Sequence, residues 1–215
     1  MIASLKGAGM VKSVPRFIAL ALMALPALAM ADRIITVPTA TKIPARGVKG
    51  EYLTYPAQET HRIWFGYGVN PLVDVEINFE SIGSGGYGTT FNAGYYYLLP
   101  ITDIAPGIAV GIHDALNQTK DGRAIYLAVT YRFGNDGELN QDLPTEVSFG
   151  GWSRDGGKVF VGATLPIASQ LRLFAEHNSI RAAAGFEVRP FQNAAFRVIF
   201  ESAATGFSFS YSRRF

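Results

Sequence analysis

His177 and Ser179, a histidine and a serine two residues apart, have the spacing best suited to nucleophilic chemistry in this sequence. In such a pair the imidazole acts as general base for the hydroxyl in ester cleavage, and a carboxylate orients the imidazole. We expect a turn at Ser179, which breaks the alternation of side chains, and we expect the nearby acid Glu187 to lie toward the opposite rim. The pair is therefore interpreted as polar residues of an exposed turn, and the protein is predicted not to be an enzyme.

Metal and cofactor chemistry is also not indicated. His113 and Asp114 are adjacent, and neighbouring strand residues point to opposite faces, so this pair predicts a polar rim rather than a metal site. The sequence contains no cysteine, which excludes thiolate zinc sites, cysteine nucleophiles and a lipid-modified cysteine. We expect no catalytic residue, no metal and no cofactor.

Charged residues recur along the chain at positions that we expect to line a lumen. They are Arg62, Asp74, Glu76, Glu80, Arg132, Glu146, Arg172, Glu176, Arg181, Glu187, Arg189, Arg197 and Glu201. Acids dominate the early members of this set, and arginines with interleaved glutamates dominate the late ones. One interpretation is a transverse field across a selective pore. The other, which we favour, is that opposite charges pair and leave the lumen filled or very narrow.

The elements that position these charges are short segments with period-2 alternation, a pattern typical of β-strands. We count about twelve, with ten as the alternative. The segments span residues 47–55, 60–68, 72–81, 88–99, 107–114, 123–133, 145–153, 158–165, 170–178, 180–189, 194–202 and 205–215. The predicted fold is all-β, an antiparallel up-and-down transmembrane β-barrel with short loops on both rims. Twelve strands fall between the eight that side chains just fill and the sixteen that leave an open channel.

Two features favour a membrane barrel over a soluble β-sandwich. The charges lie on one face of the strands, whereas a lipid-facing Arg or Lys at midplane would cost about 2 to 4 kcal/mol. The turns also alternate in chemistry: most turns after odd segments consist of Gly, Ser, Asn and Asp, and those after even segments contain proline. We expect the proline-containing turns and both termini to face the periplasm.

The chain ends on an alternating aromatic strand. Phe207, Phe209, Tyr211 and Phe215 share one face, and a terminal Phe is typical of the signal read by the outer-membrane assembly machinery. The predicted partners are therefore that machinery, outer-membrane lipid and lipopolysaccharide.

Residues 1–31 are predicted to be a signal peptide cleaved before Asp32, because basic residues precede an apolar run and a small-x-small site. Removing Lys6, Lys12 and Arg16 lowers the formal net charge of +2 by three, to −1. Such a charge does not indicate nucleic-acid binding. Residues 32–46 would form a periplasmic lead-in and residues 47–215 the outer-membrane barrel.

Several short motifs resemble those of YjbH-like outer-membrane β-barrel proteins. Residues 37–40 (VPTA) followed by residues 43–47 (IPARG) resemble the opening of that family. Residues 106–114 with 126–133, and residues 174–178 before 184–186, are similar to two of its hairpins. The resemblance implies a non-enzymatic barrel associated with exopolysaccharide or capsule production or export, or with surface assembly, and polysaccharide export proteins as partners. The alternative function is a small passive channel for ions or short solutes.

Overall fold

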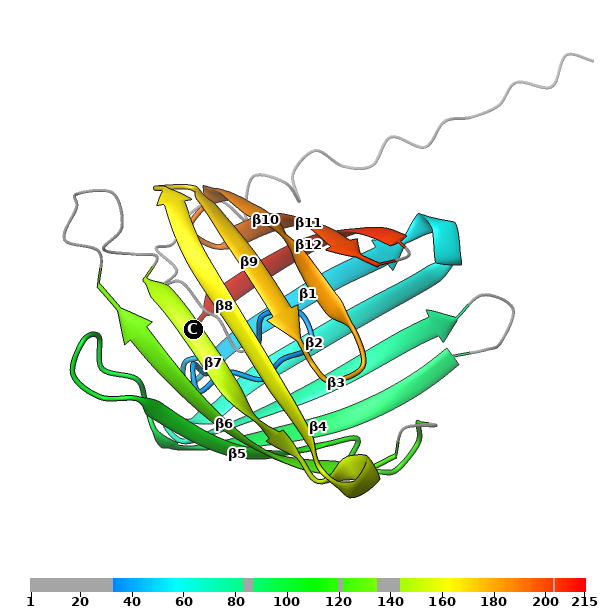
Figure 1. Ribbon diagram of the computed structural model, residues 1–215, viewed down its shortest axis with the longest axis horizontal. Helices are drawn as coiled ribbons and strands as arrows, with labels where there is room; N and C mark the ends of the chain where they lie inside the picture. Colours follow the sequence, from blue (N-terminus) through cyan, green and yellow to red (C-terminus); the bar gives the residue numbers. More distant parts are fainter. Residues whose placement is uncertain (1–32, 83–86, 120–121, 135–143, 203) are drawn as a thin grey trace, which may run out of the picture.

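The computed structural model describes residues 33–82, 87–119, 122–134, 144–202 and 204–215. Within them, twelve strands form one closed antiparallel barrel in which every strand pairs with its neighbours in sequence and β12 closes on β1 (Figure 1). The predicted fold class and strand count are confirmed. The predicted signal peptide, residues 1–31, lies outside the described residues. The strands are β1 (Gly47–Tyr55), β2 (Thr60–Asn70), β3 (Val73–Ile82), β4 (Tyr87–Leu98), β5 (Gly107–His113), β6 (Ala124–Phe133), β7 (Thr145–Trp152), β8 (Lys158–Ala168), β9 (Leu171–His177), β10 (Ala182–Phe191), β11 (Ala194–Glu201) and β12 (Ala204–Arg214).

Two strands extend past prolines that the sequence pattern predicts to lie in turns. β8 includes Pro166 and β10 includes Pro190, and each strand has a register irregularity at that point. Proline cannot donate to the strand ladder, so it is tolerated where a bulge interrupts pairing. The ends predicted for these two segments were therefore too early.

The barrel wall is apolar outside and polar inside. On β12, Phe207 and Phe209 are 49% and 41% exposed, whereas the alternate residues Ser208 and Ser210 are 5% and 6% exposed. The same alternation around the ring produces the outward apolar band and polar interior typical of membrane barrels. No helix in the described ranges has the length and apolar character needed to cross a membrane.

The segment of residues 33–46, which precedes β1, lies inside the ring of strands. Val37, Ala40 and Ile43 are fully buried, and Ile34 is nearly so. Ile34 and Val37 join the largest apolar cluster of the interior, while Ile43 packs on Trp64 and Ala40 clusters with inward residues of the wall. We call residues 33–46 the luminal segment. Strand alternation does not predict its position, because the segment is not one of the strands.

Candidate functional site: the barrel lumen

Glu187 on β10 is a fully buried carboxylate that contacts three arginines of the lumen. Its oxygens lie 2.8 Å from Nε of Arg172 on β9, 2.6 Å from Nε of Arg197 on β11 and 2.5 Å from Nε of Arg189 on β10. Arg172 also donates from Nη2 to Glu187 at 3.1 Å. The residue opposite Glu187 on each neighbouring strand is an arginine, so strand register itself assembles this cluster.

Three further ion pairs join predicted lumen residues. Arg62 lies 2.9 Å from Glu80, Arg132 lies 2.7 Å from Glu146, and Arg181 lies 3.1 Å from Glu201. Arg62 and Glu80 are directly opposite each other in the β2–β3 register, as are Arg132 and Glu146 between β6 and β7. These charges therefore pair along the wall rather than across the lumen.

Two other acids of β3, Asp74 and Glu76, accept hydrogen bonds from neighbouring groups. Asp74 accepts from the Tyr96 hydroxyl at 2.7 Å and from the backbone N–H of Ile43 at 3.3 Å. Glu76 accepts from the Asn92 amide at 3.0 Å. The Asp74 carboxylate thus joins the wall to the luminal segment.

Glu176 on β9 provides the strongest attachment of the luminal segment. Its carboxylate accepts the backbone N–H groups of Ile35 at 2.8 Å, Thr36 at 3.0 Å and Val37 at 3.1 Å, together with the Thr36 hydroxyl at 2.5 Å. Asn178 adds a bond from its amide to the Thr36 hydroxyl at 2.8 Å. Hydrogen bonds to an ionised carboxylate are shorter and stronger than neutral ones, so one side chain fixes three consecutive residues of the segment.

Other strands hold the rest of the segment. Arg197 donates to the carbonyl of Ile34 at 2.7 Å, and the Thr130 hydroxyl accepts the N–H of Ala40 at 2.7 Å. The Thr41 hydroxyl donates to Glu146 at 3.1 Å. Side chains from β6, β7, β9 and β11 thereby bond to the luminal segment and satisfy backbone groups that burial would otherwise leave unpaired.

Glycines of the wall leave the room that the luminal segment occupies. A Cβ atom added at Gly68 would lie 2.0 Å from the carbonyl oxygen of Pro44, and one at Gly66 would lie 2.3 Å from a methyl carbon of Ile43. On the far side, a Cβ at Gly162 would lie 2.5 Å from Ile34. These distances are too short for non-bonded carbon and oxygen, so the wall and the segment are complementary in shape.

The predicted set omits Lys49 and Glu51, two charged residues of β1 that face the lumen. Both are buried; Glu51 accepts from the Ser208 hydroxyl at 2.7 Å and lies 3.6 Å from Arg197, while the Lys49 amine lies 5.1 Å from the centre of the Trp64 ring. Lys49 and Glu51 are two residues apart, so their side chains lie on the same face of a strand, and this spacing was the available signal in the sequence. It was obscured because the same face continues with Leu53, so that β1 has no simple polar face.

The residues considered for chemistry make other hydrogen bonds in the structure. The Ser179 hydroxyl donates to the carbonyl of Val159, whereas Nδ1 of His177 accepts the backbone N–H of Ser179 at 3.2 Å. Asp114 instead accepts hydrogen bonds within its own loop. No group of three or more His, Cys, Asp or Glu side chains placed to hold a metal ion occurs in the described part of the chain.

The predicted assembly residues lie on the outer side of the wall. Phe207 and Phe209 face outward on β12, Tyr211 continues that face, and Phe215 is 72% exposed beyond the end of the strand. The backbone N–H of Phe215 donates to the carbonyl of Arg46 at 3.2 Å, which ties the chain end to the residue before β1.

Comparisons with known proteins show the fold. The solved structure of the KdgM porin matches with a TM-score of 0.53 and 10% sequence identity, over 79% of this chain and 99% of that chain. The outer membrane protein Omp33 of Acinetobacter baumannii matches with a TM-score of 0.52 and 10% identity, over 79% of this chain and 97% of that chain. No family model and no curated protein matches.

These comparisons contradict the resemblance to YjbH-like proteins, since the structural neighbours are the KdgM porin and Omp33 and no YjbH-like model matches. The motifs behind that resemblance are short alternations of glycine, aromatic and aliphatic residues. Any small barrel needs this alternation in its hairpins, so such motifs do not distinguish one barrel family from another.

Proposed function

We propose that this protein is an outer-membrane channel for ions or short solutes and that its own luminal segment closes it. The observation that carries the proposal is the closed twelve-strand barrel with an apolar outside and a charged inside. Two structural neighbours at this fold level are outer-membrane proteins, one of them named a porin. The surrounding lipid and lipopolysaccharide would be the partners of the outward apolar band.

The width of the lumen supports conduction. The barrel holds a segment of chain with its side chains, and it satisfies that segment's backbone groups from several strands. A space that accommodates a polypeptide segment is wide enough for ions once the segment is absent. The remaining wall would still present the charges of Asp74, Glu146 and Glu176, which suits hydrated solutes.

The burial of the luminal segment supports a closed resting state. Val37, Ala40 and Ile43 have no exposed surface, and they contact inward side chains of the wall on different sides of the lumen. Because these contacts act together with the hydrogen bonds to the Glu176 carboxylate, the luminal segment should rarely leave the lumen.

Planar-bilayer recordings test the proposal. Purified wild type should show little steady conductance, and a variant lacking residues 33–43 should conduct steadily. A milder variant, Gly68→Val, keeps the segment but places atoms where the Pro44 carbonyl lies, and it should show frequent openings. Gly88→Val is the matched control, since a Cβ at Gly88 has its nearest neighbour 4.0 Å away.

The outcomes separate the two parts of the proposal. A deletion variant that folds into a heat-modifiable barrel but does not conduct would overturn the channel function. If wild type conducts as much as the deletion variant, the channel function stands, but the luminal segment does not close the channel.

A further inference from the structure

Glu176 on β9 differs from other lumen carboxylates in the residues that lie beside it on the wall. In the strand register, Gly162 on β8 and Ala183 on β10 lie directly opposite Glu176. Glu146 on β7, in contrast, has an arginine, Arg132, directly opposite it on β6 and pairs with it. Register therefore gives Glu176 two small, uncharged neighbours where it gives Glu146 a cation.

The groups that reach the Glu176 carboxylate belong to the luminal segment. Among the described residues, its hydrogen bonds come from the backbone N–H groups of Ile35, Thr36 and Val37 and from the Thr36 hydroxyl, all of which are uncharged. The side chain is buried beneath them, and Glu176 is only 6% exposed. Once the segment leaves the lumen, this carboxylate loses these donors and faces the vacated space.

The luminal segment also carries positive charge. Residues 33–43, whose deletion should open the channel, include Arg33 and Lys42 and no acid. The guanidinium carbon of Arg33 lies 4.4 Å from the centre of the Trp64 ring, and the Lys42 amine donates to the carbonyl of Asn70 at 3.1 Å. Departure of the segment therefore takes cations away from the wall while it uncovers a carboxylate.

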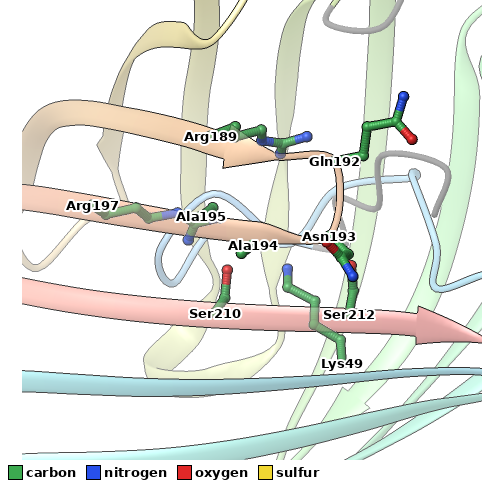
Figure 2. Close-up of a pocket in the computed structure, with 9 residues that line it drawn as sticks. All are labelled: Lys49, Arg189, Gln192, Asn193, Ala194, Ala195, Arg197, Ser210 and Ser212. Atoms are coloured by element: carbon green, nitrogen blue, oxygen red, sulfur yellow. The ribbon is translucent and has the colours of Figure 1, made fainter. Parts of the chain in front are cut away.

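Two arginines of the lumen are bonded to a different carboxylate, Glu187. Figure 2 shows them, Arg189 and Arg197, on the neighbouring strands β10 and β11. Their Nε atoms lie 2.5 Å and 2.6 Å from oxygens of Glu187. Arg197 would lose the carbonyl of Ile34 when the segment leaves, but it would keep its contact with Glu187. These two cations therefore stay bonded within the wall after the Glu176 carboxylate is uncovered.

We propose that Glu176 is a selectivity residue of the opened channel and that it favours permeation of small cations over anions. The inference rests on the proposed function, since it needs a lumen that conducts when the luminal segment is absent. A fixed charge beside a narrow water-filled path attracts ions of opposite sign and repels ions of its own sign. Alkali cations and organic ammonium ions form the solute class, and the latter can donate N–H groups to the carboxylate as the segment does.

Reversal potentials in planar bilayers, measured in a gradient of potassium chloride, test this role. The variant lacking residues 33–43 should have a ratio of potassium to chloride permeability above unity. Adding Glu176→Gln should lower that ratio about threefold or more, because a unit charge at ~7 Å in water changes the local concentration of a monovalent ion by about that factor. Glu176→Asp retains the charge and should retain most of the preference. Glu59→Gln, at an exposed position in the turn after β1, is the control and should leave the ratio unchanged.

The outcomes separate selectivity from conduction. A deletion variant that folds but does not conduct would overturn the channel function itself. A deletion variant that conducts with a ratio at or below unity, or with a ratio that Glu176→Gln does not change, would overturn the role of Glu176 while the channel function stands. If the deletion variant does not fold, the openings of Gly68→Val, with and without Glu176→Gln, give the same comparison, because the ratio does not depend on how often the channel opens.

Discussion

Replacing Glu187 by glutamine should destabilise the barrel more than any other single loss of charge in the lumen. The side chain is fully buried, and its two oxygens approach three arginines within 2.8 Å. Glutamine preserves the shape but removes the negative charge and one of the two acceptors. Arg172, Arg189 and Arg197 would then remain close together in the interior without the carboxylate that separates them.

The magnitude follows from burial. Removing one partner of a buried ion pair costs about 3 to 5 kcal/mol, because the remaining charge stays desolvated. The matched control is Glu80→Gln, whose pair with Arg62 has side chains 32% and 17% exposed. Partly exposed pairs contribute about 0 to 1 kcal/mol, so this variant should unfold almost like wild type.

Urea titration of the barrel in detergent micelles, with folded protein quantified by its heat-modifiable gel mobility, measures both variants. Combining Glu187→Gln with Arg172→Gln should cost less than the sum of the two single changes, since the double variant buries one cation fewer. Equal free energies of unfolding for Glu187→Gln and Glu80→Gln would refute the reasoning.

Three further predictions concern assembly, orientation and pH. Deleting Phe215 should reduce the amount of folded barrel in outer-membrane fractions, because it removes the terminal aromatic residue and its bond to the chain before β1; unchanged amounts would contradict this. Ser202→Cys should react with a membrane-impermeant maleimide on intact cells and Gln192→Cys should not, and the reverse pattern would invert the topology. Burial alone would raise the pKa of Asp114, but hydrogen bonds from the Thr119 hydroxyl and from the backbone N–H groups of Gln118 and Thr119 hold that pKa below its usual 3.8. The stabilisation of this loop should therefore persist above about pH 3.8 and fall as pH drops below it. In hydrogen-exchange measurements, the Asp114→Asn variant should lose the protection of the Thr119 amide already at neutral pH. Equal protection of that amide in wild type and in the variant would argue against this role of Asp114.

Much of the wall could be predicted because strand alternation is a local property. On β12, serines alternate with Phe207 and Phe209, and this pattern alone separates a polar face from an apolar one. The period of two also placed Arg172, Glu187 and Arg197 on the same side of their strands before any pairing was known. Proline was a weaker guide, since Pro166 and Pro190 lie within strands that continue past them through bulges.

The partners of these charges depended on register and closure. Glu187 contacts Arg172 and Arg197 because β9 and β11 place these arginines directly opposite it, and a shift of one residue would have turned them toward lipid. Glu51 and Lys49 belong to the same network only because β12 closes on β1, which brings Ser208 to Glu51 across 157 residues of sequence.

The sequence by itself determined that this chain forms a closed barrel with an apolar exterior and a charged interior. The tertiary structure alone decided what fills that interior. Thr36 and Glu176 are 140 residues apart, and the segment around Thr36 has no strand periodicity that could reveal its location. Its position follows from the space left by wall glycines such as Gly68 and from carboxylates that need donors, and both conditions exist only after the ring of strands has closed.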